Sequence, residues 1–277
     1  MKIKATLLLA FAAIVWGASF LPSKLILEVC GVYEYLFYRF IISSFLFFII
    51  VFKDIKNNYK NSYLGGSLSG ICMAVAFILQ TLSLKYIQSS SVAFLTGLNV
   101  IMVPFLSLIL FKKIPSLKTI FLCFLACFGL YLFQNANINS FYIGEFLSLA
   151  CALFFALLIV LVEKFLKDND LNSFVFFQFF ACAVVCFFAA LFLDKISLAP
   201  LKDMQSLIYI IISAMILTIF CFFAQNYAQK FLQAQVVAIL LLLEPISAGI
   251  IGYYFGEDFT KLQIVGIVLI LLALAFC

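Results

Sequence analysis

The sequence predicts an all-α integral membrane protein of ten transmembrane helices, built as two inverted five-helix repeats. Three observations lead to this fold class. Apolar residues make up 67% of the 277 residues and charged residues only 10%, which leaves too few polar side chains to cover a water-soluble domain. The apolar residues gather in long continuous runs, and one stretch of sequence recurs 145 residues later.

Each apolar run is close to the ~20 residues that a helix needs to cross a hydrocarbon core. The runs are continuous rather than alternating, which favours helices over the strands of a β-barrel. The short connections between them carry nearly all of the charge and leave no room for a water-soluble domain. In chain order we expect membrane helices at residues 5–23, 33–52, 64–84, 90–111, 117–134, 143–163, 172–193, 205–228, 236–256 and 262–277.

The first run follows Met1-Lys2-Ile3-Lys4, a beginning that is also typical of a signal peptide. It has no convincing cleavage site, because Trp16, Pro22 and Lys24 interrupt the place where one would lie. We therefore interpret this run as the first membrane helix.

The last two runs are separated by the polar turn Glu257-Asp258-Phe259-Thr260-Lys261. The earlier of the two carries Glu244-Pro245 almost at its centre. A carboxylate at that depth costs ~2.5–3.5 kcal/mol on insertion scales. Glu244 must therefore be paired, hydrated in a cavity, or protonated. Pro245 withdraws one backbone donor and frees a carbonyl about one turn earlier, near Leu241.

An internal repeat relates the two halves of the chain. Residues 80–95 match residues 225–240 at an offset of 145, with six of the sixteen positions identical. The polar matches are informative, since Gln80, Lys85 and Gln88 recur as glutamine, lysine and glutamine. The same register places Asn99 over Glu244. We predict one five-helix repeat at residues 1–134 and a second at 143–277.

The lysines set the orientation of the helices. One side of the expected topology receives eleven lysines and the other five, so the positive-inside rule places both termini in the cytoplasm. Because each half has five spans, an odd number, the second half enters the membrane from the opposite side and the repeat is inverted. The net charge of +5 reflects these membrane-flanking lysines rather than binding to nucleic acid. The two groups are Lys2, Lys4, Lys53, Lys56, Lys60, Lys112, Lys113, Lys118, Lys164, Lys167 and Lys230 against Lys24, Lys85, Lys195, Lys202 and Lys261.

The repeat ends in a Leu-Glu-Pro helix (Leu243 to Pro245), a short charged turn and a last apolar helix. With Trp16-Gly17 in the first helix and Arg39-Phe40 in the second, this pattern resembles the EamA family of the drug/metabolite transporter superfamily. The resemblance covers essentially the whole chain, and it implies transport, with export of amino acids or similar solutes favoured. The first half departs from the family pattern, because Asn99-Val100 stands where the second half has Glu-Pro. A role for the family's acid therefore transfers to Glu244 alone.

Seven polar or aromatic residues inside the runs are candidates for substrate binding or gating. Most of them have a structural alternative: snorkelling or pairing for Arg39, packing for Trp16, bridging of helices for Gln178, and capping of helix ends for Gln80 and Gln225. Glu244 could equally hydrogen-bond its own helix. The candidates are Trp16, Arg39, Gln80, Asn99, Gln178, Gln225 and Glu244.

The sequence favours a secondary transporter, an efflux protein for small metabolites in the cytoplasmic (inner) membrane. Nine cysteines without a CxxC pair, and no histidine, do not form a metal or redox site, so we expect no cofactor. No nucleotide-binding motif is present, which excludes ATP as the direct driver. The expected partners are a small-molecule substrate and the lipid bilayer. A lipid flippase or a non-transporting scaffold is the alternative, and an intramembrane enzyme is a weaker one.

Overall fold

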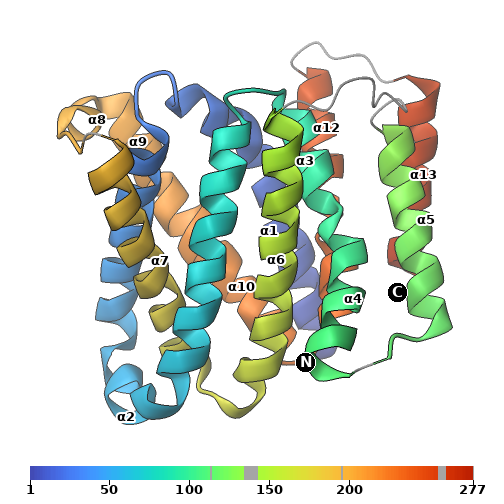
Figure 1. Ribbon diagram of the computed structural model, residues 1–277, viewed down its shortest axis with the longest axis horizontal. Coiled ribbons are helices and arrows are strands. Elements are labelled where there is room, and N and C mark those ends of the chain that lie inside the picture. Colours follow the sequence, from blue (N-terminus) through green and yellow to red (C-terminus); the bar gives the residue numbers. More distant parts are fainter. Residues whose placement is uncertain (113, 134–142, 195, 255–259, 277) are drawn as a thin grey trace.

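The computed structural model describes residues 1–112, 114–133, 143–194, 196–254 and 260–276, and every regular element in them is helical (Figure 1). Two elements depart from the α-helix: η1 is a 3-10 turn and η2 is a π-helix. In chain order the elements are α1 (Lys2–Ile26), α2 (Val32–Ser83), α3 (Ser89–Gly97), α4 (Asn99–Phe111), α5 (Leu117–Phe133), α6 (Ile143–Phe165), η1 (Leu166–Asp168), α7 (Leu171–Leu193), α8 (Ala199–Lys202), α9 (Met204–Ile212), η2 (Ser213–Phe220), α10 (Cys221–Gln229), α11 (Ala234–Leu240), α12 (Leu243–Tyr254) and α13 (Lys261–Ala275).

Eight segments in the described part of the chain are long and apolar enough to cross a membrane. They include both arms of α2 (Val32–Lys56 and Ser62–Ser83) and the composite segments Ser89–Phe111 and Met204–Gln229. Large apolar side chains cover the outside of the bundle, for example Phe45 at 63% and Phe192 at 76% exposure. Such a surface belongs in lipid rather than in water. The apolar helices α5 and α13 are shorter, with 17 and 15 residues, so ten spans remain a prediction.

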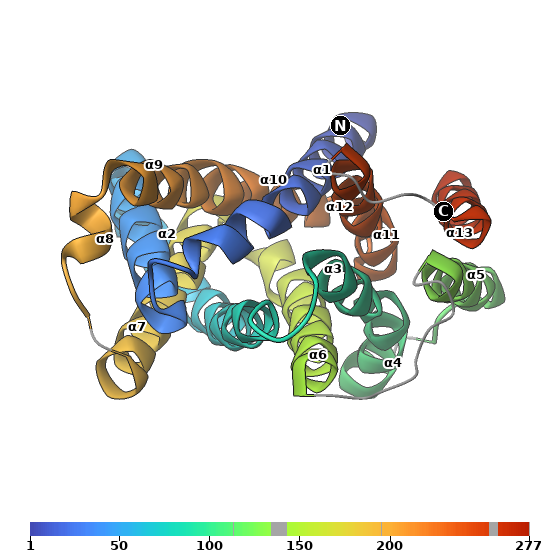
Figure 2. The same cartoon turned by 90° about the horizontal axis from the view of Figure 1, so that it is seen from above.

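The helices α1 and α6, which begin the two predicted repeats of the chain, run in opposite directions. In Figure 1, α1 rises from the lower end while α6 descends from the upper end. The helix α2 descends, turns back at the lower end and rises again. The helices α4 and α13 both descend. Seen from above, α5 and α13 lie side by side at one edge of the molecule (Figure 2), and α13 contacts mainly α5.

Two predicted single helices are broken in the structure. The run 90–111 is divided into α3 and α4 at Leu98, and the run 236–256 into α11 and α12 at Leu241-Leu242. In the second case the cause is local: Pro245 has no N–H, and the Leu241 carbonyl accepts from the Glu244 N–H at 2.9 Å instead. At the first break Ile101 N–H donates to the Leu98 carbonyl, although residue 100 is a valine.

Small residues allow close packing between the helices that surround the centre. The second arm of α2 lies against α7, and a Cβ on Gly70 would collide with the Gln178 carbonyl. In lipid the hydrophobic effect does not drive helices to associate. Close backbone approach and buried polar contacts hold them together instead. This packing leaves a hollow between α1, α2, α6 and α10 on one side and the two broken helices on the other.

Candidate functional site

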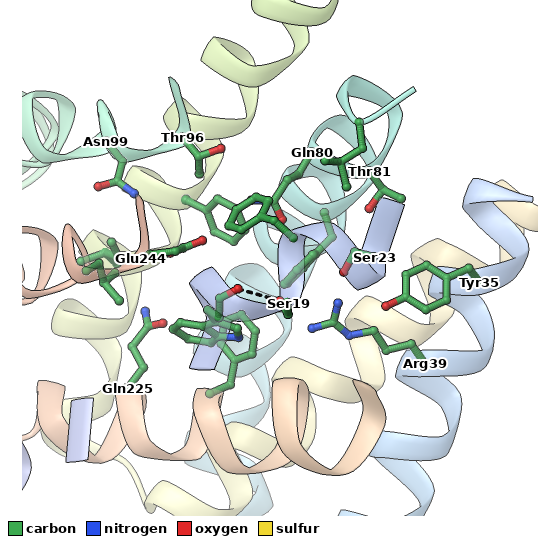
Figure 3. A pocket seen from close by; sticks show the side chains of 18 residues that line it. Ser19, Ser23, Tyr35, Arg39, Gln80, Thr81, Thr96, Asn99, Gln225 and Glu244 are labelled. Carbon is green, nitrogen blue, oxygen red and sulfur yellow. Dashed lines mark hydrogen bonds between the residues drawn. The ribbon is translucent and has the colours of Figure 1, made fainter. Parts of the chain in front are cut away.

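A pocket lies at the centre of the bundle and encloses about 670 Å³ of atom-free space, with open solvent at its mouth included. Little of this space is wide enough for a water molecule, so the pocket is narrow in this conformation. Its apolar lining is Trp16, Phe20, Phe77, Leu84, Phe155, Ile159, Phe222 and Leu241. Its polar lining, drawn in Figure 3, is Ser19, Ser23, Tyr35, Arg39, Gln80, Thr81, Thr96, Asn99, Gln225 and Glu244.

Six of the seven residues that the sequence singled out line this pocket. They come from α1, both arms of α2, the two broken helices and α10, which are far apart in sequence. The seventh, Gln178 on α7, lies outside the lining, and its Oε1 accepts from Asn226 Nδ2 at 2.9 Å. Gln178 thus bridges α7 and α10, which was the structural alternative for this residue.

Sequence reasoning missed several polar residues of the pocket. Ser19 and Ser23 follow Trp16 by three and seven positions, so a helix places all three on one face. Tyr35 precedes Arg39 by four positions, and Thr81 adjoins Gln80. The helical period measured from each candidate residue could therefore have found them. Hydroxyl residues are common where membrane helices pack together, so their residue type alone does not mark them as pocket residues.

Trp16 and Arg39 meet at one backbone carbonyl of the π-helix η2. Trp16 Nε1 donates to the Leu217 carbonyl at 2.8 Å, and Arg39 Nη2 approaches the same oxygen at 3.4 Å. Arg39 Nε donates to Thr218 Oγ1 at 2.7 Å. These bonds join α1 and α2 to η2, and π-helical turns are often found at functional sites.

The broken helix α11/α12 lies very close to α1. A Cβ on Gly17 would collide with the Glu244 carbonyl and with Ser247 Oγ, so only glycine fits there. The Ser247 hydroxyl donates to the same Glu244 carbonyl at 3.0 Å. The Glu244 side chain points into the pocket (Figure 3), and no ion pair joins it to Arg39 in the described residues. On the other broken helix, Asn99 Oδ1 is buried and has no hydrogen-bond partner in the described part of the chain.

A group of buried polar contacts, which we call the lower seal, closes the bundle below the pocket. Glu163 on α6 is 4% exposed, and its Oε2 accepts from the Ala234 N–H, the first residue of α11, at 3.0 Å. Gln229 Nε2 donates to the Ile159 carbonyl at 2.7 Å. We define the lower seal as these two contacts together with the Asn226–Gln178 bond.

Polar contacts also hold the upper end of the pocket. Lys24 Nζ donates to the Ile87 carbonyl at 3.1 Å, which ties the end of α1 to the connection before α3. Ser23 and Tyr209 share a hydroxyl–hydroxyl bond of 2.8 Å. The pocket lining reaches Ser23 and Leu84 but includes neither Glu163 nor Ala234. The pocket therefore extends toward the upper end of the molecule.

Metal chemistry has no support in the described part of the chain. It contains no group of three or more histidine, cysteine or acidic side chains that could hold a metal ion. The pocket instead offers one guanidinium, one carboxyl group, amides, hydroxyls and aromatic rings, which suit binding of a small solute through hydrogen bonds, charge and stacking.

Apolar helices around a central pocket with polar groups define a multi-pass membrane protein. Comparison with known proteins identifies the particular family: the model of the EamA-like transporter family matches residues 3–134 and 142–277, and the chain belongs to this family.

Similar proteins agree with this assignment. An uncharacterized transporter of Archaeoglobus fulgidus is 27% identical over 276 residues, covering 98% of this chain and 85% of the relative. A second uncharacterized transporter of the same organism is 45% identical over 47 residues, or 17% of each chain. A crystal structure matches the fold with a TM-score of 0.78, at 12% identity, over 100% of this chain and 96% of its own.

Proposed function

We propose that this protein is a secondary transporter that exports a small metabolite, such as an amino acid, across the cytoplasmic (inner) membrane by alternating access. The observation that carries the proposal is the central pocket, in which Arg39 and Glu244 face a cavity deep inside an apolar bundle. Charged groups at membrane depth are expensive, and they persist where they serve a substrate or ion path. A gradient of the substrate or of protons supplies the energy.

Ten membrane-spanning helices in two inverted repeats, residues 1–134 and 143–277, complete the proposal. Three observations support it: the two family matches fall almost on these bounds, α1 and α6 run in opposite directions, and both halves contain one broken helix at the pocket. Inverted repeats allow a protein to exchange two conformations around a central site. Both termini lie in the cytoplasm, the side that receives most lysines.

Alternating access requires one end of the pocket to close while the other opens. The pocket lining reaches the upper end and stops short of the lower seal, which supports a state in which the lower end is shut. With the lower end cytoplasmic, this is the state that exchanges solute with the outside. Opening toward the cytoplasm then requires Glu163 to release the N-terminus of α11.

The proposal is tested by measuring uptake of labelled solutes into proteoliposomes that contain the purified protein. We expect saturable uptake of at least one small metabolite above that of protein-free vesicles. A resistance screen in cells, with many metabolites supplied in excess, selects the solutes to label. If lipid but no soluble metabolite is moved, the protein is a flippase, and if nothing is moved, a scaffold. A reporter fused to the C-terminus that is active only outside the cytoplasm contradicts the topology.

A further inference from the structure

Arg39 is a buried cation whose hydrogen-bonding capacity is only partly used. Its side chain is 4% exposed, and it faces the pocket from the first arm of α2. Of its five N–H donors, one is directed at Thr218 Oγ1 and one at the Leu217 carbonyl. Among the described residues no acidic group lies within ion-pair distance of Arg39, and Nη1 has no hydrogen-bond acceptor. A buried charge in this condition requires compensation.

The protein contacts hold the guanidinium in one orientation. Thr218 Oγ1 donates its own proton to the Ser213 carbonyl at 3.0 Å, so its lone pair faces Arg39 Nε. The guanidinium carbon also lies 4.6 Å from the centre of the Phe77 ring and 5.4 Å from that of Phe40. Arginine stacks in this way on aromatic faces. One edge of the planar group is thus held by the protein, while the other has no protein partner.

A planar fork of N–H donors matches a carboxylate or phosphate through two parallel hydrogen bonds. The pocket favours the carboxylate, because it holds one cation and also the carboxyl group of Glu244, on the opposite side in Figure 3. A phosphate dianion would carry a second negative charge that no described lining residue neutralises. The apolar part of the lining is mostly aromatic, and the Phe77 ring contacts the rings of Phe155 and Phe222.

We propose that Arg39 binds the carboxylate of the solute, and that this solute is a small organic monocarboxylate whose apolar part packs between Phe77, Phe155 and Phe222. The inference rests on the transport function proposed above for the same pocket. It adds the chemical class of the substrate and the group that recognises it.

The single tryptophan of the chain gives a direct readout. Trp16 lines the pocket, and its indole N–H shares the Leu217 carbonyl with Arg39. A ligand on Arg39 changes the surroundings of this indole. Intrinsic fluorescence of the purified protein therefore reports occupancy without a transport assay.

The test uses two matched pairs of probes, 4-methylpentanoate with its primary amide and leucine with leucinamide, together with inorganic phosphate. We expect at least one of the two acids to change the Trp16 fluorescence saturably. The amide of that acid and inorganic phosphate should leave the fluorescence unchanged. The proposal is overturned if the acids and amides of both pairs respond equally, if neither acid responds, or if phosphate is the ligand that binds.

Variants of Arg39 complete the test. Arg39→Met should abolish the response and Arg39→Lys should raise the Kd by about tenfold, because lysine keeps the charge but loses the planar fork. Lys85→Met, which removes an exposed cation outside the pocket lining, is the matched control and should bind like the wild type. An unchanged Kd in folded Arg39→Met or Arg39→Lys overturns the proposal. If Arg39→Met does not fold, the acid–amide comparison on the wild type and the Arg39→Lys titration still test whether Arg39 binds the carboxylate.

The experiments distinguish a failure of the Arg39 subsite from a failure of the transport function. Acid-selective binding without uptake into proteoliposomes leaves the Arg39 subsite standing and contradicts the transport function. Uptake that is equal for an acid and its amide supports transport and contradicts the subsite.

Discussion

The two broken helices, α3/α4 and α11/α12, are equivalent in sequence but are held very differently. Both begin at the same repeat position, after Gln88 and Gln233, whose backbones are almost identical (φ −67°, ψ 149° and φ −74°, ψ 155°). Both break about ten residues later, beside Asn99 and Glu244. The repeat therefore preserves the backbone of this element in each half.

The surroundings of the two elements differ. The Ala234 N–H at the N-terminus of α11 donates to Glu163, and the start of α12 lies against Gly17, where a Cβ would collide with the Glu244 carbonyl. Before α3, the Ile87 carbonyl receives a bond from Lys24, and a Cβ on Gly97 would meet its nearest neighbours at ordinary distances of 3.4–3.5 Å. The comparison teaches that the same broken helix is held by different contacts in the two halves. We expect α3/α4 to move more easily in this state, because the contacts of Glu163 and Gly17 hold α11/α12.

The largest expected effect comes from the contact between α1 and α12. Gly17→Ala places a methyl group into the Glu244 carbonyl and Ser247 Oγ, and overpacking of this kind costs about 1–3 kcal/mol. We expect the melting temperature of the detergent-solubilised protein to fall by about 2–12 °C. Gly97→Ala is the matched control and should leave it unchanged or slightly higher, since alanine favours the helix. Equal losses in both variants contradict the difference between the two elements.

The second effect concerns the lower seal. Glu163→Ala leaves the buried Ala234 N–H without its acceptor, which costs about 1–3 kcal/mol in the closed state. Hydrogen exchange across residues 229–240 should then accelerate about tenfold for each 1.4 kcal/mol lost. Glu163→Gln keeps an acceptor oxygen and should retain most of the protection. Full protection in Glu163→Ala shows that this contact does not hold α11.

The third effect concerns Glu244, which can release a proton, whereas Asn99 at the matching repeat position cannot. Glu244→Gln keeps the size and the hydrogen-bonding capacity of the side chain but cannot release a proton. We expect uptake into proteoliposomes to fall about tenfold, equivalent to ~1.4 kcal/mol, while the melting temperature and expression hold. Wild-type rates across pH 5 to 8 rule out proton coupling through Glu244. A fall in melting temperature instead assigns Glu244 a structural role.

The smallest effect is expected at Lys24. Lys24→Met removes one partly buried hydrogen bond to the Ile87 carbonyl, worth about 0.5–1.5 kcal/mol. Hydrogen exchange over residues 84–92 should change by less than it does over residues 229–240 in Glu163→Ala. Lys85→Met again serves as the control. An effect as large as that of Glu163→Ala reverses the assignment of the more mobile element.

The sequence predicted the helices well and their interruptions only in part. Pro245 indicated a freed carbonyl near Leu241, and the structure breaks the helix there. The break at Leu98 had no such signal, because no proline follows at residue 100. Glu163 also escaped notice, since an acid near the end of a membrane helix is indistinguishable in sequence from a membrane-flanking charge.

By itself, the sequence determined the membrane character, the helical class, the offset of the internal match and half of the polar residues at the pocket. These properties depend on local apolar length and on residue type, which partition between water and lipid without reference to the rest of the chain. Only the tertiary structure decided which polar groups meet. Arg39 and Leu217, or Glu163 and Ala234, come together through the rotation and tilt of helices. Apolar residues cover nearly every face of those helices, so their pattern does not specify which face turns inward.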